Sequence, residues 1–486
     1  MRSFLTGSWR QTHLRTDSIV QLHLQALADS KFAPLWTDQD ARPEPLPALA
    51  KDEKCQLLVV GGGFTGLWAA MQAKEQMPDL DVILIEAKEI AEGASGRNGG
   101  FLSSSLSHGD SNSDVHFPGE TDRLHELGQQ NLKEFIDTLE RHKIDARYEK
   151  VGELTVATSP ERAQALREEY EELKDEGENP VWFDQEAIRK EINSPTYFAG
   201  LWEHEGQDGV VDPAYLCWGL KKVVLELGVR IFEGTSMHTM SPDGSGMKLE
   251  TTGGSIRCDR ILMGTNAYPS PINEANRTII PVWDYAFATE PLSPAQLESI
   301  GWQRRHGVGD YVNMFYYTRL THDNRITWGG GGVVNYHYGS RRDQKWADPP
   351  DRFARLSKQF FETFPQLEGI RFSHRWSGII ASTTRFCMAP GSAYDGRVSW
   401  AIGYTGHGVG ATRFGARIGL ELLGYNPTDI LEMQFVKKTP MAWPPEPLRW
   451  IGVTLTRKEM ARADRNNGKR GLWLKLLDHF NLGFAC

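Results

Sequence analysis

The stretch Gly61-Gly62-Gly63-Phe64-Thr65-Gly66 decides the fold, because it matches the G-x-G-x-x-G pattern of dinucleotide-binding turns. It follows the apolar run 55–60, which is typical of a buried parallel strand, and it opens a helix expected over 67–77. A second buried strand is expected over 81–86, so the three elements form one βαβ unit. Glu86 ends that strand, at the distance where an acid accepts hydrogen bonds from a ribose.

The glycines of this first loop predict a pyrophosphate site. Residues without a Cβ permit a tight turn and let backbone N–H groups approach a phosphate at the positive end of the next helix. The cofactor contacts predicted here are Gly61, Gly63, Phe64, Thr65, Gly66, Glu86 and Ala87. A glycine-rich turn without a ligand is the alternative interpretation. FAD and NAD share the fingerprint, so another part of the sequence must distinguish them.

A second loop, Gly-Ala-Ser-Gly-Arg-Asn-Gly-Gly-Phe over 93–101, favours FAD. An NAD dehydrogenase has no use for four more glycines and a serine at this point. A larger cofactor does, because its pyrophosphate and ribityl chain must pass this backbone. The contacts predicted here are Ala94, Ser95, Gly96, Arg97, Asn98, Gly99 and Gly100. For Arg97 the alternative role is to order the loop.

With both loops quoted, the sequence resembles the FAD-dependent amine and amino-acid oxidoreductases of the D-amino acid oxidase (DAO) superfamily, over about residues 54–425. The Gly-Ala-Ser-Gly-Arg-Asn-Gly-Gly stretch is most similar to the γ-glutamylputrescine oxidoreductases within it. Segments that agree further along the chain are 152–157, 212–213, 264–268, 325–330 and 403–408. The resemblance implies further flavin contacts from Thr265 and Asn266, and from the segment Gly406, His407, Gly408 and Val409.

The expected fold is α/β, with α+β character in the second domain: a Rossmann-type FAD-binding domain carries an inserted substrate domain built on an antiparallel sheet. The FAD-binding domain is expected to comprise 54–110, 200–275 and 372–435, and the substrate domain 111–199 and 276–371. Residues 1–53 are expected to be an extension packed on this body, and 436–486 a C-terminal tail that acts as an ordered cover.

The resemblance implies oxidation of a C–N bond in an amine. Hydride passes from the carbon next to nitrogen to flavin N5, water hydrolyses the imine to an aldehyde and an amine or ammonia, and O2 reoxidises the flavin to give H2O2. One alternative is a dehydrogenase that passes electrons to a quinone or a carrier protein. Another is a non-catalytic flavoprotein or partner-binding module. The candidates for catalysis are Arg319, His407 and Tyr317.

Two departures from family patterns bear on the cofactor and the substrate. The cysteine that binds flavin covalently in sarcosine oxidases is matched by Thr384, with Cys387 nearby, so we expect non-covalent FAD. The sarcosine oxidase lysine that holds the substrate carboxylate is matched by Gly410. Unless Arg319 or Arg97 replaces that lysine, the reacting carbon of the substrate carries no carboxylate.

Composition excludes several classes of protein. Lys and Arg number 54 and Asp and Glu 63, so a chain of net charge −9 is a poor candidate for nucleic-acid binding. No apolar run approaches the roughly 20 residues of a membrane span. The five scattered cysteines show no metal-binding pair and favour the cytoplasm. The oligomeric state does not follow from the sequence.

Overall fold

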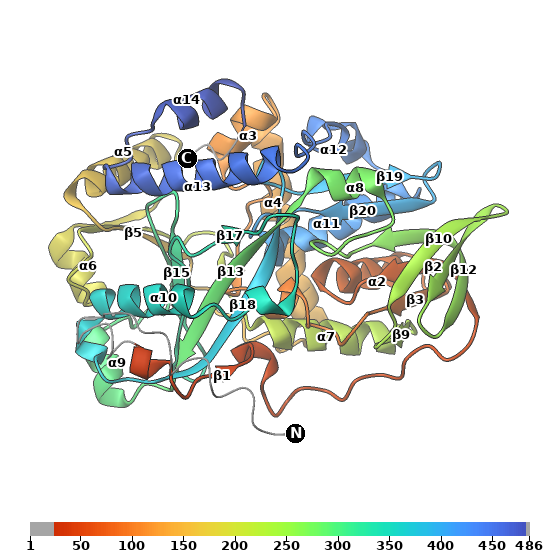
Figure 1. Cartoon of the computed structure of the whole chain (residues 1–486), viewed down its shortest axis with the longest axis horizontal. Coiled ribbons are helices and arrows are strands. Elements are labelled where there is room, and N and C mark those ends of the chain that lie inside the picture. Colours follow the sequence, from red (N-terminus) through yellow and green to blue (C-terminus); the bar gives the residue numbers. More distant parts are fainter. Residues whose placement is uncertain (1–23, 483–486) are drawn as a thin grey trace.

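A computed structural model describes residues 24–482, and two β-sheets dominate it (Figure 1). Residues 1–23 of the expected extension and 483–486 of the expected tail, including Cys486, lie outside the described residues. Between the sheets and around them run thirteen α-helices within 24–482. These are α2 (Phe64–Gln76), α3 (Asp110–His116), α4 (Thr121–Arg141), α5 (Pro160–Asp175), α6 (Gln185–Glu191), α7 (Pro213–Glu226), α8 (Asn273–Thr278), α9 (Pro294–Ile300), α10 (Pro350–Thr363), α11 (Gly408–Leu422), α12 (Gln434–Lys437), α13 (Leu448–Arg465) and α14 (Leu472–His479).

The first sheet has a parallel centre, in which β2 pairs with β3 and β12, β3 pairs with β9, and β12 pairs with β20. A hairpin, β10 and β11, extends one edge, and β19 pairs antiparallel with β20. The strands are β2 (Glu53–Val60), β3 (Val82–Ile85), β9 (Arg230–Phe232), β10 (Met237–Asp243), β11 (Gly246–Thr251), β12 (Gly254–Met263), β19 (Ala389–Ala393) and β20 (Val398–Ile402). This is the predicted βαβ unit within a Rossmann-type sheet.

The second sheet is mainly antiparallel, in the order β1-β18-β13-β16-β15-β14-β5-β7-β6, with β17 beside β13. Only its pairs β1–β18 and β14–β5 are parallel among the described strands. Its strands are β1 (Lys31–Phe32), β5 (Glu153–Ala157), β6 (Val181–Phe183), β7 (Ala199–Glu203), β13 (Ile280–Thr289), β14 (Gly307–Asp310), β15 (Tyr316–Leu320), β16 (Ile326–Gly330), β17 (Asn335–Tyr336) and β18 (Phe372–Ser382). A short pair, β4 (Phe101–Leu102) and β8 (Gly209–Val210), stands apart. The predicted α/β class with an antiparallel second sheet is confirmed.

The strand pairing departs from the expected domain boundaries at two places. The boundary at residue 200 cuts β7, which pairs with β5 and β6 in the second sheet. The boundary at 372 assigns β18 to the FAD-binding segments, whereas β18 pairs with β13 along nearly its whole length. Both strands lie at the end of an expected insertion, and their hydrogen bonds join them to the second sheet. The division into an FAD-binding and a substrate domain stays a prediction.

Helix α2 lies on the parallel sheet because its sequence is apolar on almost every side. All its residues from Phe64 to Lys74 are buried, and it packs against α7 and α11 as well as the strands. Helix α7 begins where the Asp212 carboxylate accepts hydrogen bonds from the N–H groups of Ala214 and Tyr215. Because α2 is packed on several sides, its first residues, which face the second glycine loop, are held in place.

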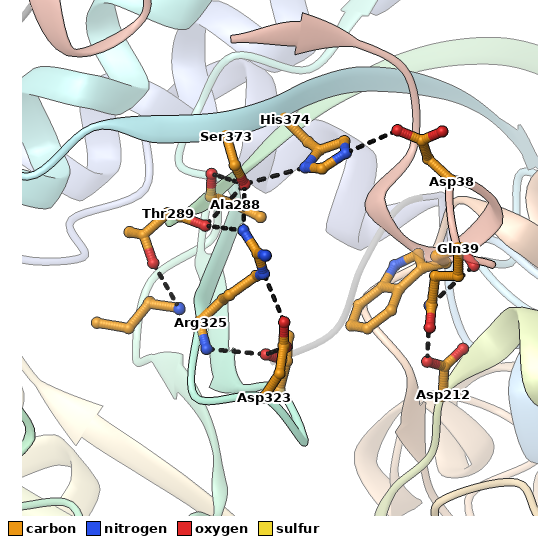
Figure 2. A network of polar contacts seen from close by, with 12 residues as sticks. Asp38, Gln39, Asp212, Ala288, Thr289, Asp323, Arg325, Ser373 and His374 are labelled. Atoms are coloured by element: carbon orange, nitrogen blue, oxygen red, sulfur yellow. Dashed lines mark hydrogen bonds and ion pairs between the residues drawn. The ribbon is translucent and has the colours of Figure 1, made fainter. Parts of the chain in front are cut away.

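The described part of the N-terminal extension is tied to both halves of the molecule. Besides pairing β1 with β18, it places Asp38 Oδ2 3.0 Å from His374 Nε2 on β18, and Gln39 Nε2 donates to Asp212 Oδ2 (3.2 Å; Figure 2). The buried Trp36 donates its indole N–H to the carbonyl of Asn98 (2.8 Å). The extension therefore braces the second glycine loop from outside.

Candidate flavin and substrate cavity

One cavity of about 1080 Å³ is lined by both glycine loops, by strands of both sheets and by the C-terminal tail. Its volume lies slightly above the roughly 300–1,000 Å³ typical of ligand sites, so a dinucleotide and a small substrate both have room. One end lies at the carboxyl ends of β2 and β3, where parallel sheets bind nucleotides. The other end lies between the second sheet and α13 and α14.

The first loop forms a cradle of backbone groups. Gly61 has φ of 111°, and a Cβ there would lie 2.9 Å from the carbonyl oxygen of Gly264. Helix α2 starts after Gly63 without a side-chain cap, and Phe64 N donates to Ser95 Oγ of the second loop (2.9 Å). Because the N-terminal end of the helix is partly positive and faces the cavity, the loop fits a diphosphate.

Glu86 lies at the base of this cradle. Its two carboxylate oxygens accept hydrogen bonds from Gly62 N (2.7 Å) and Lys88 N (2.9 Å). Burial raises its pKa above the ordinary range of a glutamate. Each oxygen keeps a second lone pair, and the residue lines the cavity, so ribose hydroxyls can donate to it.

The second loop is ordered by its own polar side chains. Asn98 Nδ2 donates to the carbonyls of Ala94 and Ser95 (3.1 Å each), and its Oδ1 accepts from Gly100 N (2.8 Å). Arg97 donates from Nε and Nη2 to Glu92 and from Nη1 to the Ser377 carbonyl. All three guanidinium nitrogens of Arg97 are thus engaged, so the geometry favours the loop-ordering role for this residue.

The segment before α11 meets the cavity from the opposite side. Gly406 has φ of 102° and open space where a Cβ would stand, and Asn266 Oδ1 accepts from Gly403 N (3.0 Å). The His407 ring stacks on His108 at 3.8 Å, and burial lowers its pKa to about 4. His407 is therefore neutral at pH 7, and its Nδ1 has no hydrogen-bond partner among residues 24–482. A buried polar atom without a partner beside a cavity fits contact with a ligand.

Asp284 on β13 places a carboxylate in the middle of the cavity wall. Tyr317 on β15 donates its hydroxyl to Asp284 Oδ2 (2.9 Å), and both residues line the cavity. Burial raises the pKa of Asp284 to about 6, although the hydrogen bonds from Tyr317 and from backbone N–H groups oppose that rise. Glu153 on β5 also lines the cavity, and its pKa is raised to about 7 by burial and by Asp208. Asp284 and Glu153 therefore give this part of the cavity wall an acidic character.

Comparison with known proteins agrees with the cradle. The family model described as FAD dependent oxidoreductase (DAO) matches residues 56–422. The chain belongs to the DAO family of FAD-dependent oxidoreductases. It is an enzyme of that family, and its cofactor is FAD. The glycine loops, Glu86 and the start of α11 line the cavity, and they are the contacts that we predict for this cofactor.

Two relatives are similar to the chain in sequence, and two solved structures are similar to it in fold. It is 31% identical over 385 residues to the gamma-glutamylputrescine oxidoreductase of Escherichia coli, covering 78% of this chain and 86% of that protein. A probable oxidoreductase of Haemophilus influenzae is 30% identical over 391 residues, with coverage of 78% and 84%. Glycine oxidase from Bacillus cereus superposes with a TM-score of 0.64 at 14% identity, covering 78% of this chain and 98% of that one. L-proline dehydrogenase from P. horikoshii gives 0.61 at 19%, covering 80% and 99%.

Most residues predicted from the sequence converge on the cavity of this DAO-family chain. Those that line it are Gly61, Gly63, Phe64, Thr65, Glu86, Ala87, Ala94, Ser95, Arg97, Asn98, Gly99, Gly100, Thr265, Asn266, Tyr317, Gly406, His407, Gly408 and Val409. Gly66 and Gly96 do not. They are packing positions, since a Cβ on Gly66 would lie 1.9 Å from the Gly61 carbonyl oxygen, and one on Gly96 2.0 Å from that of Ala91.

Arg319 is the predicted catalytic candidate that the structure moves away from the cavity. Its side chain is buried behind the second loop, where Nη1 donates to the carbonyls of Val211 (2.6 Å) and Gly100 (3.3 Å). Its guanidinium also lies over the Trp36 ring, 5.5 Å from the centroid. We correct the prediction: Arg319 does not line the cavity and holds the loop backbone instead.

Asp284 and the surface that the tail covers are the features that sequence reasoning missed. A single acid within the apolar strand Ile280–Thr289 is an unusual residue for a buried position, and that was the available signal. The tail lines the cavity through Met441, Trp443, Leu448, Arg449, Ile451, Arg457, Trp473, Leu474 and Leu477, among others. Its apolar periodicity predicted burial, but the surface that it covers could not be inferred from it.

No helix within 24–482 combines the length and the apolar character needed to cross a membrane. In the same range, no group of three or more His, Cys, Asp and Glu side chains is arranged to hold a metal ion.

Proposed function

We propose that this enzyme oxidises the C–N bond of an amine whose reacting carbon carries no carboxylate, giving an imine that water hydrolyses to an aldehyde. The observation that carries the proposal is the charge on the cavity wall: Asp284 offers a buried carboxylate, and the cations expected to bind a substrate carboxylate are absent or engaged. Bound FAD supplies the hydride acceptor, while the protein binds the amine and orients its C–H bond.

No lysine can replace Gly410 without rearrangement. A Cβ at Gly410 would lie 2.3 Å from the carbonyl oxygen of Ser103, and Asn131 donates to the Gly410 carbonyl (3.0 Å) from the neighbouring helix α4. The helix start is therefore packed directly on backbone. This supports a substrate without a carboxylate at the position that sarcosine oxidases recognise.

The two arginines that sequence analysis offered as substitutes for that lysine are both occupied. Arg97 is bonded to Glu92 and to the Ser377 carbonyl, and Arg319 is bonded to the backbone of the second loop. The other cations on the cavity wall are Lys88, next to the acid of the first loop, and three arginines of the tail at the far end: Arg449, Arg457 and Arg470.

Asp284 is suited to bind an ammonium group. Its pKa of about 6 leaves it charged at pH 7, and the Tyr317 hydroxyl fixes the orientation of one oxygen. The other oxygen, Oδ1, accepts from Tyr285 N (2.8 Å), and a further charge-assisted hydrogen bond from a substrate amine to this carboxylate would be short and strong in this buried setting. The relative from Escherichia coli is named for γ-glutamylputrescine, a derivative of a diamine, which agrees with an amine substrate.

Matched substrate pairs test this proposal. We expect an alkylamine to exceed the corresponding α-amino acid in kcat/KM by more than about tenfold, roughly 1.4 kcal/mol of transition-state preference. A preference for the amino acid would show that the cavity binds a carboxylate after all, and the proposal would be wrong.

For the electron acceptor we propose O2, reduced to H2O2. A quinone is the second candidate, since Met441, Leu448 and Ile451 give the outer end of the cavity an apolar rim. Rapid reoxidation of the reduced enzyme in air-saturated buffer supports O2. Slow reoxidation that a quinone accelerates supports the dehydrogenase.

Non-covalent FAD and a cytoplasmic location complete the proposal. Cys387 is buried and does not line the cavity, which supports a flavin without a thioether bond. The four described cysteines, all buried, form no disulfide among residues 24–482, which supports a reducing compartment.

A further inference from the structure

The exposed apolar side chains of this protein gather on the C-terminal tail. Twelve large hydrophobic residues within 24–482 are exposed, and seven of them belong to the tail: Met441, Leu448, Trp450, Ile451, Leu472, Leu476 and Phe480. An eighth, Tyr338, has its ring 6.5 Å from that of Trp450. Scattered apolar residues need no explanation, but a concentration on one segment is typical of a binding surface.

Helix α14 carries apolar residues on two opposite faces. Trp473, Leu474 and Leu477 face inward and line the cavity, and Trp473 Nε1 donates to Thr456 Oγ1 of α13 (2.9 Å). Leu472, Leu476 and Phe480 follow one another at four-residue steps and face solvent; Leu472 is 89% exposed. We call these three residues the outward stripe. A helix that only covered a cavity would need the inward face alone.

The charge of the tail is opposite to that of the rest of the chain. Residues 441–482 contain eight Lys and Arg against four Asp and Glu, a balance of +4 in a chain of −9. Lys458, Arg462, Arg465, Lys469 and Lys475 are exposed. Lys469 and Lys475 flank Leu472, the first residue of the outward stripe, in the sequence, so exposed cations and exposed apolar side chains occur together along this segment.

We propose that the tail docks this enzyme on an anionic membrane surface, with the outward stripe entering the headgroup region and the basic side chains contacting lipid phosphates. Apolar residues flanked by Lys and Arg on a short helix are the composition of helices that lie in the membrane interface. Figure 1 shows α13 and α14 together at the top of the view, above strands β5, β15 and β13 of the second sheet. The proposal rests on exposure and charge, independently of the proposed function.

Docking would place the mouth of the cavity at the lipid surface. Met441, Leu448 and Ile451 are exposed and also line the cavity, so the apolar surface of the tail continues into it. A molecule dissolved in the membrane would then reach the cavity along an apolar path. No helix enters the bilayer core in this arrangement.

Vesicle sedimentation tests the proposal with the full-length FAD-loaded enzyme. We expect at least tenfold stronger binding to vesicles of phosphatidylcholine with phosphatidylglycerol than to phosphatidylcholine alone, weakened by salt. The double variant Leu472→Ser and Leu476→Ser should lose at least fivefold of that binding. Leu225→Ser, which removes an exposed leucine on α7, is the matched control and should bind like the parent.

Leu472 and Leu476 do not line the cavity, so the double variant should keep its flavin absorbance and its activity in vesicle-free buffer. Any of three vesicle-binding results would overturn the proposal. They are no vesicle binding by the parent enzyme, equal binding to both vesicle types, or a double variant that binds like the parent. Sedimentation velocity is the parallel measurement: a dimer that the double variant converts to monomers would assign the stripe to a second copy of the chain and also overturn membrane docking.

Discussion

The two ends of the cavity differ in the groups that form their walls. At the nucleotide end, backbone groups of two glycine loops approach one another, and side chains such as Ser95 and Asn98 serve to hold that backbone. At the mouth, side chains of the tail form the wall, and the tail lies beyond residues 56–422, which match the family model. Backbone geometry therefore forms the cavity wall at the nucleotide end, whereas the side chains of a segment outside the family match form the wall at the mouth.

The largest effect is expected from Gly63→Val at the nucleotide end. A Cβ at Gly63 would lie 2.9 Å from Ser95 Oγ, and the rest of the valine would occupy space needed by a pyrophosphate. We expect FAD affinity to fall at least about 100-fold, roughly 2.7 kcal/mol. The ratio of flavin to protein absorbance after dialysis measures it.

The matched control is Gly452→Val at the other end. A Cβ at Gly452 would meet nothing within 4 Å, so this variant should keep full FAD occupancy. If Gly63→Val also kept its flavin, the first loop would not be the pyrophosphate site.

The parts of the fold and site that depend on local sequence could be predicted, and the parts that depend on contacts between distant segments could not. Glycine spacing, a preceding apolar strand and Glu86 are local features, so the sequence predicted the βαβ unit and nearly all of the cradle. Arg319 was misassigned because its neighbours on β15 do not reveal that the carbonyls of Val211 and Gly100 lie within its reach. Asp284 was missed because its partner Tyr317 is on another strand, and contacts across a sheet leave no spacing in the sequence.

Deleting residues 441–486 should remove the wall at the mouth of the cavity and leave the glycine loops of the cradle in place. The deletion removes the buried Leu474, the hydrogen bond from Trp443 Nε1 to the Ser382 carbonyl (3.2 Å), and Asp464, whose carboxylate accepts from Asn313 N (2.9 Å). We expect kcat/KM to fall at least about tenfold, roughly 1.4 kcal/mol. Flavin content should stay above half. Steady-state kinetics and flavin absorbance measure the two effects, and unchanged activity and thermal stability would show that the tail is a dispensable appendage.

Asp284→Asn tests the acidic wall between the two ends. The variant keeps the size of the side chain and removes its charge, so kcat/KM for a cationic amine should fall by about 10–100-fold, roughly 1.4–2.7 kcal/mol. In the parent enzyme the acid limb of the pH profile should lie near pH 6, because the carboxylate is protonated below its raised pKa. The limb assigned to Asp284 should be missing from the profile of the variant.

The stability of Asp284→Asn should change in the opposite direction. Since burial raises the folded-state pKa to about 6, the contribution of the carboxyl to stability is fully present below its unfolded pKa of about 3.9 and is lost as pH rises through about 6. Asparagine has no such loss, so the variant should gain about 1–3 kcal/mol relative to the parent at pH 8 and little at pH 4. Equal differences at both pH values would show that the carboxyl is not the cause.

The smallest effect is expected from Cys387→Ser, which tests whether the flavin is held only by non-covalent contacts. Cys387 is 1% exposed, and burial raises the pKa of its thiol to about 11, so the nucleophilic thiolate is scarce at neutral pH. Thr384, the residue that does line the cavity here, donates its hydroxyl to the Met441 carbonyl (3.1 Å) and has no thiol. We therefore expect acid precipitation to release FAD from the parent enzyme and from Cys387→Ser to the same extent, with identical flavin spectra.

The variant should lose only about 1–2 kcal/mol of stability, because a hydroxyl replaces a buried thiol. Flavin that stays on the precipitated parent polypeptide but leaves the variant would identify Cys387 as a covalent attachment site.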